Sequence, residues 1–228
     1  MTMLKRRRGQ PRPLANQVVA ITGGARGIGH ATARALAHQG ARVAIGDLDG
    51  DLADEVAIEL GGHAFGVGVD VTDNAALTAF LDGVERRFGP LDVLVTNAGN
   101  MSAGPIATKF GVAGFSEAVA IELRGTGIEM SVVRPSLCHT ELASGFAGLR
   151  GMPFIEPQDV ARRIVETLQR PRFDVPVPKS MGPMLWLNQA LPFRARAALA
   201  HLTKADDVLS HIDAEERAAY VERVKASA

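Results

Sequence analysis

The chain contains little cysteine and few large aromatic side chains: its 228 residues include one cysteine, one tryptophan and one tyrosine. A single thiol, Cys138, excludes an intramolecular disulfide framework and a zinc site built on cysteines, because each needs more than one thiol. We therefore expect a reducing, cytoplasmic setting and no bound metal. A run of about 20 uninterrupted apolar residues is also lacking, so we expect no membrane span.

Neither sign of charge is in excess, since 25 basic and 25 acidic side chains give a formal net charge of zero. The start of the chain is nevertheless basic and holds no acid in residues 1–16; its charged residues are Lys5, Arg6, Arg7, Arg8 and Arg12. The start has no apolar segment of the kind that a secretory signal requires. A contact for nucleic acid or anionic lipid and a solvated tail are the two interpretations. One short basic run binds weakly in salt, so we expect a flexible tail and no nucleic-acid partner.

Apolar runs alternate with segments of helical period through the first half of the chain. The apolar runs predict strands over residues 17–22, 41–46, 63–69 and 91–96. The intervening segments predict helices over 28–39, 50–60 and 73–88. Repeated strand–helix alternation with right-handed crossovers predicts an α/β fold, a doubly wound parallel sheet covered on both faces.

The alternation becomes irregular after residue 97. A loop over 97–105 is followed by a predicted helix over 106–124, a strand over 127–134, a helix over 157–170, an edge strand over 172–178 and a charged terminal helix over 213–226. The apolar stretch 184–199 has two interpretations, an amphipathic lid or interfacial helix and a surface helix packed on its own domain. We expect a C-terminal helical extension over 181–228 that packs on the main domain.

A glycine-rich loop stands between the first predicted strand and the first predicted helix. Gly23, Gly27 and Gly29 give the spacing G-x-x-x-G-x-G. Glycine permits a positive φ and a close approach of the backbone, so a pyrophosphate is able to rest on the helix N-terminus. A plain turn is the alternative, but the position between strand and helix favours a dinucleotide loop.

An acid, Asp47, ends the second predicted strand. A carboxylate there accepts hydrogen bonds from the ribose hydroxyls of NAD and repels the 2′-phosphate of NADP. Arg26 in the glycine loop argues the other way, because a guanidinium binds such a phosphate. A helix cap for Asp47 and a solvated loop charge for Arg26 are the alternatives. We predict NAD as the cofactor, with NADP less favoured.

Over residues 17 to about 180 the sequence resembles the short-chain dehydrogenase/reductase family, whose loop reads T-G-x-x-x-G-x-G. The family's acid–hydrophobe pair that brackets adenine matches Asp70-Val71, and its N-N-A-G stretch matches Thr96-Asn97-Ala98-Gly99 with the first asparagine replaced. Residues 107–112 resemble the surroundings of the lysine in the family's Y-x-x-x-K motif. The family's following helix, strand and nicotinamide-side loop are resembled by Glu122-Leu123, by residues 128–135, which end at Pro135, and by Thr140.

The resemblance implies a Rossmann-type domain over residues 17–180 and an NAD(P)(H)-dependent oxidoreductase that acts on an alcohol or ketone. It assigns the catalytic lysine to Lys109. The cofactor-binding positions that follow from the loop, the acid and the resemblance are Gly23, Arg26, Gly27, Ile28, Gly29, Asp47, Leu48, Asp70, Val71, Asn97, Ala98, Gly99, Lys109, Pro135 and Thr140.

The sequence departs from the family at its proton donor. The family's tyrosine stands four residues before the lysine, where this chain has Pro105. Gly99 and Lys109 are so close that the family's intervening strand, helix and serine do not fit, which implies a missing block of about fifty residues. Proline has no proton to give, so we expect impaired catalysis. Ser102 and His139 are the replacement acids to consider, and a non-catalytic dinucleotide-binding protein or a truncated product is the alternative function.

The missing block also affects the expected sheet and the expected assembly. We expect six strands instead of seven, with the strand over 127–134 paired to the strand over 91–96 in place of the lost one. Failing that, a sheet edge and an apolar helix face become exposed. The family's interface helix belongs to the missing block, so homo-oligomerisation stays open.

Overall fold

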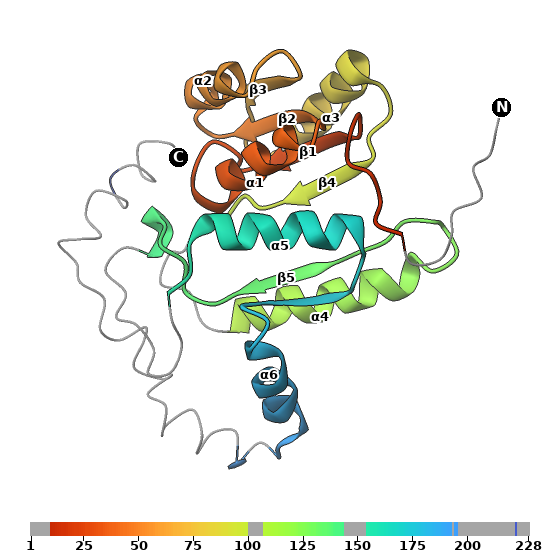
Figure 1. The fold of residues 1–228 in the computed structure, drawn as a ribbon, viewed down its shortest axis with the longest axis vertical. Coiled ribbons are helices and arrows are strands. Elements are labelled where there is room, and N and C mark those ends of the chain that lie inside the picture. The colour runs from red at the N-terminus through yellow and green to blue at the C-terminus, as the bar shows by residue number, and fades with distance from the viewer. Residues whose placement is uncertain (1–9, 100–106, 144–153, 193, 196–221, 223–228) are drawn as a thin grey trace.

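The computed structural model describes residues 10–99, 107–143, 154–192, 194–195 and 222 (Figure 1). Its first half alternates strands and helices in this order: β1 (Val18–Thr22), α1 (Gly27–His38), β2 (Arg42–Asp47), α2 (Gly50–Leu60), β3 (Ala64–Gly68), α3 (Asn74–Phe88) and β4 (Val93–Thr96). The second half comprises α4 (Ala107–Glu122), β5 (Val132–Pro135), a 3₁₀ turn (Glu141–Ala143), α5 (Pro157–Gln169), β6 (Asp174–Val177) and α6 (Met181–Ala190).

The first four strands form one parallel sheet in the order β3-β2-β1-β4. Every residue of β1 is buried, because β1 has a neighbour on each side and helices on both faces. This explains why the strand reads as an unbroken apolar run without alternation. The α/β parallel sheet expected from the sequence is confirmed.

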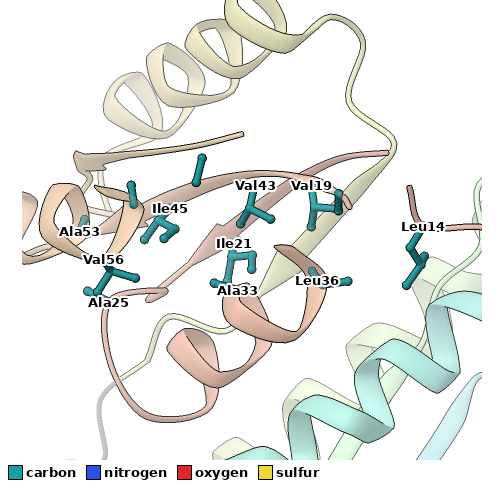
Figure 2. Close-up of a cluster of buried hydrophobic side chains, with 13 residues drawn as sticks. Leu14, Val19, Ile21, Ala25, Ala33, Leu36, Val43, Ile45, Ala53 and Val56 are labelled. Carbon is teal, nitrogen blue, oxygen red and sulfur yellow. The ribbon is translucent and has the colours of Figure 1, made fainter. Parts of the chain in front are cut away.

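Two apolar cores cover the two faces of this sheet. Val19 and Ile21 of β1 point to one face and pack with Leu36 of α1 and with the apolar side chains of β2 and α2 (Figure 2). Val18 and Ala20 point to the other face, against α3. Each fully buried Val, Leu or Ile side chain contributes about 1.5–3 kcal/mol, so these cores hold the strand ends in place.

The strands β5 and β6 form a separate parallel pair. The pairing that we expected between the strand over 127–134 and the strand over 91–96 is wrong. The strand also starts later than expected, at Val132; the residues at the expected start form a turn, in which Gly127 adopts a φ of 84° and the Thr126 hydroxyl accepts the Ile128 N–H at 3.2 Å. The two sheets are instead joined by α5, which packs along α1 (Figure 1).

The other expectation, an exposed edge and an exposed helix face, matches the described residues. Within them β4 pairs only with β1, and Leu94 of β4 is 43% exposed. On α4, Val112, Phe115 and Ile121 are all more than half exposed. Apolar side chains are therefore exposed both on β4 and on α4.

Two residues before β1, Arg12 and Leu14, fasten this segment to the body of the protein. Leu14 is 2% exposed and belongs to the core that α1 covers (Figure 2). The Arg12 N–H donates to the Gln169 carbonyl at 2.9 Å, and the Arg12 side chain forms an ion pair with Glu129. Only residues 1–9 of the expected tail lie outside the described residues.

The predicted terminal helix over 213–226 falls almost wholly outside the described residues. Of the apolar stretch 184–199, the structure describes the part in α6, where Trp186 is exposed. Among the helices that the structure describes, none has both the length and the apolar character needed to cross a bilayer.

Candidate functional site

The glycine-rich loop forms a tight turn between β1 and α1. A Cβ on Gly29 would lie 2.0 Å from the Gly23 carbonyl oxygen and 2.7 Å from Asn97 Nδ2, so only glycine fits there. Gly23 and Gly27 have positive φ values of 64° and 54°. Arg26 is the N-cap residue of α1 and gives it no side-chain cap. The loop thus presents a helix N-terminus of the kind that binds anions.

The loop after β4 is fastened to this turn. The Asn97 side-chain amide donates to the Gly23 carbonyl at 2.8 Å, and the Thr22 hydroxyl accepts the N–H groups of Asn97 and Ala98 at 3.2 Å each. Ala98 Cα lies 2.7 Å from the position of a Cβ on Gly23. The structure therefore brings together three predicted site residues from two strands, while Gly99 beyond them is exposed.

Asp47 ends β2 beside the same turn. Its carboxylate accepts the Ala25 N–H at 3.0 Å and the Asp49 N–H at 3.3 Å, which fixes its orientation. The residue is half-buried, so part of it still faces the solvent side of the loop. The neighbouring Leu48 is more than half exposed. An acid held in this way is suited to accept further hydrogen bonds from a ribose.

Sequence reasoning missed Asp49, two residues further on. Asp49 accepts the Leu52 N–H at 3.1 Å and so caps α2. Its other oxygen lies 2.7 Å from Nη2 of Arg26, forming an ion pair across the mouth of the loop. The available signal was its place directly before a helix, where aspartate is a favoured cap.

Asp70 and Val71 follow β3 at the same edge of the sheet, where the Val69 N–H donates to the Asp47 carbonyl at 2.7 Å. The Thr72 hydroxyl and N–H donate to Asp70 at 2.7 and 2.8 Å, and these bonds hold the pKa of the Asp70 carboxyl below its ordinary value. Both predicted residues are exposed. The pair is therefore accessible beside Asp47.

Residues after β5 complete this edge from the second sheet. Thr140 Cγ2 lies 3.2 Å from the position of a Cβ on Gly27, so the two loops touch. Ile28 packs against the apolar cluster of the second half. Pro135, the last residue of β5, is exposed. Residues that follow five strands thus lie together at the carboxyl edge of the first sheet. Four of these strands belong to the first sheet and one, β5, to the second.

The structure describes the residues considered for proton transfer less completely. The backbone of Lys109 belongs to α4, but its side chain is outside the described part of the structure. Ser102 and Pro105 lie wholly outside the described residues. His139 is exposed, with Nε2 3.9 Å from a Glu156 oxygen and its ring 4.6 Å from that of Phe154. Cys138 beside it is buried.

A cavity of about 760 Å³ lies away from this edge, between the C-terminal end of α4 and residues 171–173. These segments precede β5 and β6, at the end of the second sheet remote from the glycine loop, and the cavity includes no predicted site residue. No group of three or more metal-ligating side chains occurs in the part of the chain that the structure describes.

Fold and loop together define the class: an α/β protein with a Rossmann-type sheet whose carboxyl edge carries a glycine-rich strand–loop–helix unit. The family model for short chain dehydrogenases matches residues 17–107. The chain belongs to the short-chain dehydrogenase/reductase family, whose members use NAD(P) cofactors.

Several curated relatives share this segment. An uncharacterised oxidoreductase of Bacillus subtilis, YxbG, is 39% identical over 116 residues, which cover 50% of this chain and 42% of that protein. The inactive 2-(S)-hydroxypropyl-CoM dehydrogenase 2 of Xanthobacter autotrophicus is 36% identical over 143 residues, covering 60% of this chain and 62% of the relative. The cis-4-hydroxycyclohexanecarboxylate dehydrogenase of Sinomonas cyclohexanicum is 42% identical over 117 residues, 50% and 47% of the two chains. The chain spans about half the length of these relatives.

Solved structures share the fold. A 3-ketoacyl-(acyl-carrier-protein) reductase from Brucella melitensis, complexed with NADH, matches with a TM-score of 0.62 at 22% identity, over 72% of this chain and 97% of that one. A short chain dehydrogenase from Burkholderia cenocepacia in complex with NADP matches with a TM-score of 0.65 at 22% identity, over 73% and 98%.

Proposed function

We propose that the chain binds NAD(H) along the carboxyl edge of its first sheet and is an oxidoreductase-type protein for an alcohol or ketone whose proton-transfer step is impaired. The observation that carries the binding proposal is the turn at Gly29, which leaves no room for a side chain between Gly23 and Asn97. A turn of this kind lets the backbone approach a ligand closely.

The residues present fit a dinucleotide. The backbone of the glycine loop and the start of α1 would hold the pyrophosphate, and Asp47 would accept from the adenosine ribose. Asp70 and Val71 would flank the adenine. Pro135, Thr140 and the Asn97–Gly99 loop would border the nicotinamide half. Residues 17–180 would then form one dinucleotide-binding unit, extended by 181–228.

When bound, the nicotinamide ring supplies or accepts the hydride. The chain's own task is to give or take the proton at the substrate oxygen, which needs a titratable group of suitable pKa. Pro105 has none, and Lys109 on its own lacks a phenol whose pKa it would lower. The short connection from Gly99 to Lys109 supports a loss of about fifty residues, a strand and a crossover helix among them.

A non-catalytic dinucleotide-binding protein is the second candidate. The same proline favours it, and one of the relatives above carries the word inactive in its name. Ser102 and His139 separate the two candidates. If either is a replacement acid, removal of its side chain abolishes turnover and leaves cofactor binding intact.

The first test is a titration of the purified protein with NADH, followed by nucleotide fluorescence and by thermal unfolding in parallel. A cooperative melt that rises with NADH supports the binding proposal, because a ligand that binds only the folded state stabilises it. Asp47→Ala should weaken NADH binding, whereas Asp51→Asn, an exposed acid in the first turn of α2, should not. A melting temperature that does not change when NADH is added refutes the proposal.

Turnover is then measured over a panel of secondary alcohols with NAD and of ketones with NADH. Substrate oxidation that disappears in His139→Ala or Ser102→Ala supports an enzyme with a rebuilt acid. NADH binding without any turnover supports the non-catalytic candidate.

A further inference from the structure

The ion pair between Arg26 and Asp49 bears on which dinucleotide the loop accepts. Both residues stand at the mouth of the glycine loop, Arg26 at the start of α1 and Asp49 at the start of α2. We propose that Asp49 is a specificity-determining residue, which holds the Arg26 guanidinium away from the 2′-phosphate position and thereby favours NAD over NADP. This inference rests on the proposed dinucleotide function.

The first step of the argument is the fixed position of Asp49. One carboxylate oxygen accepts the Leu52 N–H at 3.1 Å as the cap of α2, and the other lies 2.7 Å from Arg26 Nη2. The cap bond holds the carboxylate in one orientation before any ligand arrives. Arg26 therefore pairs with a partner that is already ordered, which lowers the entropy cost of the ion pair.

The second step is the charge around the ribose position. Asp47 is bound to the loop through the Ala25 N–H at 3.0 Å and carries one negative charge. Asp49 cancels the positive charge of Arg26, so the three side chains together present one negative charge to an incoming phosphate. A neutral pair of ribose hydroxyls is accepted, and a dianionic 2′-phosphate is opposed.

The third step is that the pair remains open to solvent, since the side chains of Arg26 and Asp49 are 38% and 40% exposed. An exposed ion pair is worth about fivefold or less in an equilibrium constant. A guanidinium released from it is able to bind a phosphate through two charge-assisted hydrogen bonds. A change at Asp49 alone should therefore weaken the preference for NAD, while Asp47 continues to oppose the phosphate.

The test measures dissociation constants of NADH and NADPH by nucleotide fluorescence for the full chain and its variants. Asp49→Asn and Asp49→Ser both keep a favoured helix cap and remove the charge. We expect each to lower the ratio of the NADPH dissociation constant to the NADH dissociation constant by about fivefold. Asp51→Asn removes the same charge from the same turn of α2 without touching Arg26, and it should change the ratio by less than about twofold.

The role of Arg26 is tested in a double-mutant cycle. Arg26→Ala should cancel the gain that Asp49→Asn gives for NADPH, because the released guanidinium is then absent. The inference is overturned if the ratio of the two dissociation constants stays unchanged in both Asp49 variants, or if the gain in NADPH affinity persists without Arg26. Either result leaves the proposed function intact. If neither nucleotide binds the wild-type chain, the proposed function and this inference fail together.

Discussion

The side-chain amide of Asn97 donates to the carbonyl oxygen of Gly23 across 2.8 Å, so the end of β4 fastens the glycine loop that follows β1. The same amide also donates to the Thr22 carbonyl at 3.3 Å. Both acceptors belong to neighbouring backbone units of the turn. The Asn97 side chain therefore holds the end of β4 against the glycine turn without the help of a ligand.

The substitution Asn97→Ala removes both hydrogen bonds. It should lower the free energy of unfolding by about 1–3 kcal/mol, because two partly buried carbonyls lose their donor. NADH affinity should fall by about tenfold as the loop loses its fixed form, equivalent to about 1.4 kcal/mol. Urea unfolding and NADH titration measure the two effects. The exposed Asn74 at the start of α3 provides the control, and Asn74→Ala should leave NADH affinity unchanged.

Gly29→Ala should destabilise the protein by about 2–4 kcal/mol, because a Cβ at 2.0 Å from the Gly23 carbonyl forces the backbone apart. The same substitution has the opposite sign at Gly114 in α4, where a Cβ meets nothing within 4 Å. Gly114→Ala should stabilise the helix by about 0.5–1 kcal/mol. Urea unfolding of both variants checks the pair, and equal effects at the two sites would contradict the geometry of the loop.

The pKa of Asp70 should rise toward its ordinary value in Thr72→Ala, which removes the hydroxyl that lowers it most. A carboxyl with a lowered pKa in the folded state adds stability above its unfolded pKa, and this contribution is lost as the pH falls through the lowered value. Carbon-13 NMR of the Asp70 carboxyl measures the shift directly. Thr78→Ala is the matched control, since the Thr78 hydroxyl donates only to the Asn74 carbonyl among its described bonds. An identical Asp70 titration in Thr72→Ala would count against the assignment.

Cys138 should resist alkylation in the folded protein. Burial, reinforced by the carboxylates of Glu156 and Asp159, raises the pKa of its thiol to about 11, and only the thiolate reacts. Iodoacetamide at pH 8 should label the thiol rapidly in urea and slowly without it. Rapid labelling of the native protein would show that this environment is more open than the structure has it.

The raised pKa of Cys138 also predicts a pH dependence of stability. Between the ordinary pKa of 9.0 and the folded value of about 11, the unfolded thiol ionises while the folded one stays neutral. Stability is therefore lost as the pH rises through this interval. The melting temperature of the wild type should fall more steeply there than that of Cys138→Ala, in which this group is absent.

The first half of the fold was predictable because each of its elements has a local signal. The buried strand at Val18–Thr22 is a short apolar run, and the helix at Asn74–Phe88 has apolar side chains at helical spacing. The pairing of β5 was not predictable, because an apolar strand fits either neighbour equally well. That choice depends on the packing of α5 along α1, which no short stretch of sequence records.

The site was predictable where glycine spacing or a strand end exposes it, as at Gly29 and Asp47. The partner of Arg26 was missed, since the ion pair with Asp49 depends on how close two loops lie. The spacing of residues along the chain does not reveal how close two loops lie in the folded protein. The sequence likewise could not place His139 next to Glu156, seventeen residues further along the chain.

The division of the strands between two sheets has a consequence for the order in which the molecule is made. In the part of the chain that the structure describes, strands β1 to β4 have all their ladder partners within residues 18–96, so this sheet is able to form while later residues are still being synthesised. The side of α1 that α5 covers, however, stays exposed to solvent until Pro157–Gln169 has left the ribosome. At that stage a nascent chain therefore carries a four-stranded sheet together with an uncovered apolar flank of α1, and exposed apolar surface of this kind favours aggregation until α5 has been made.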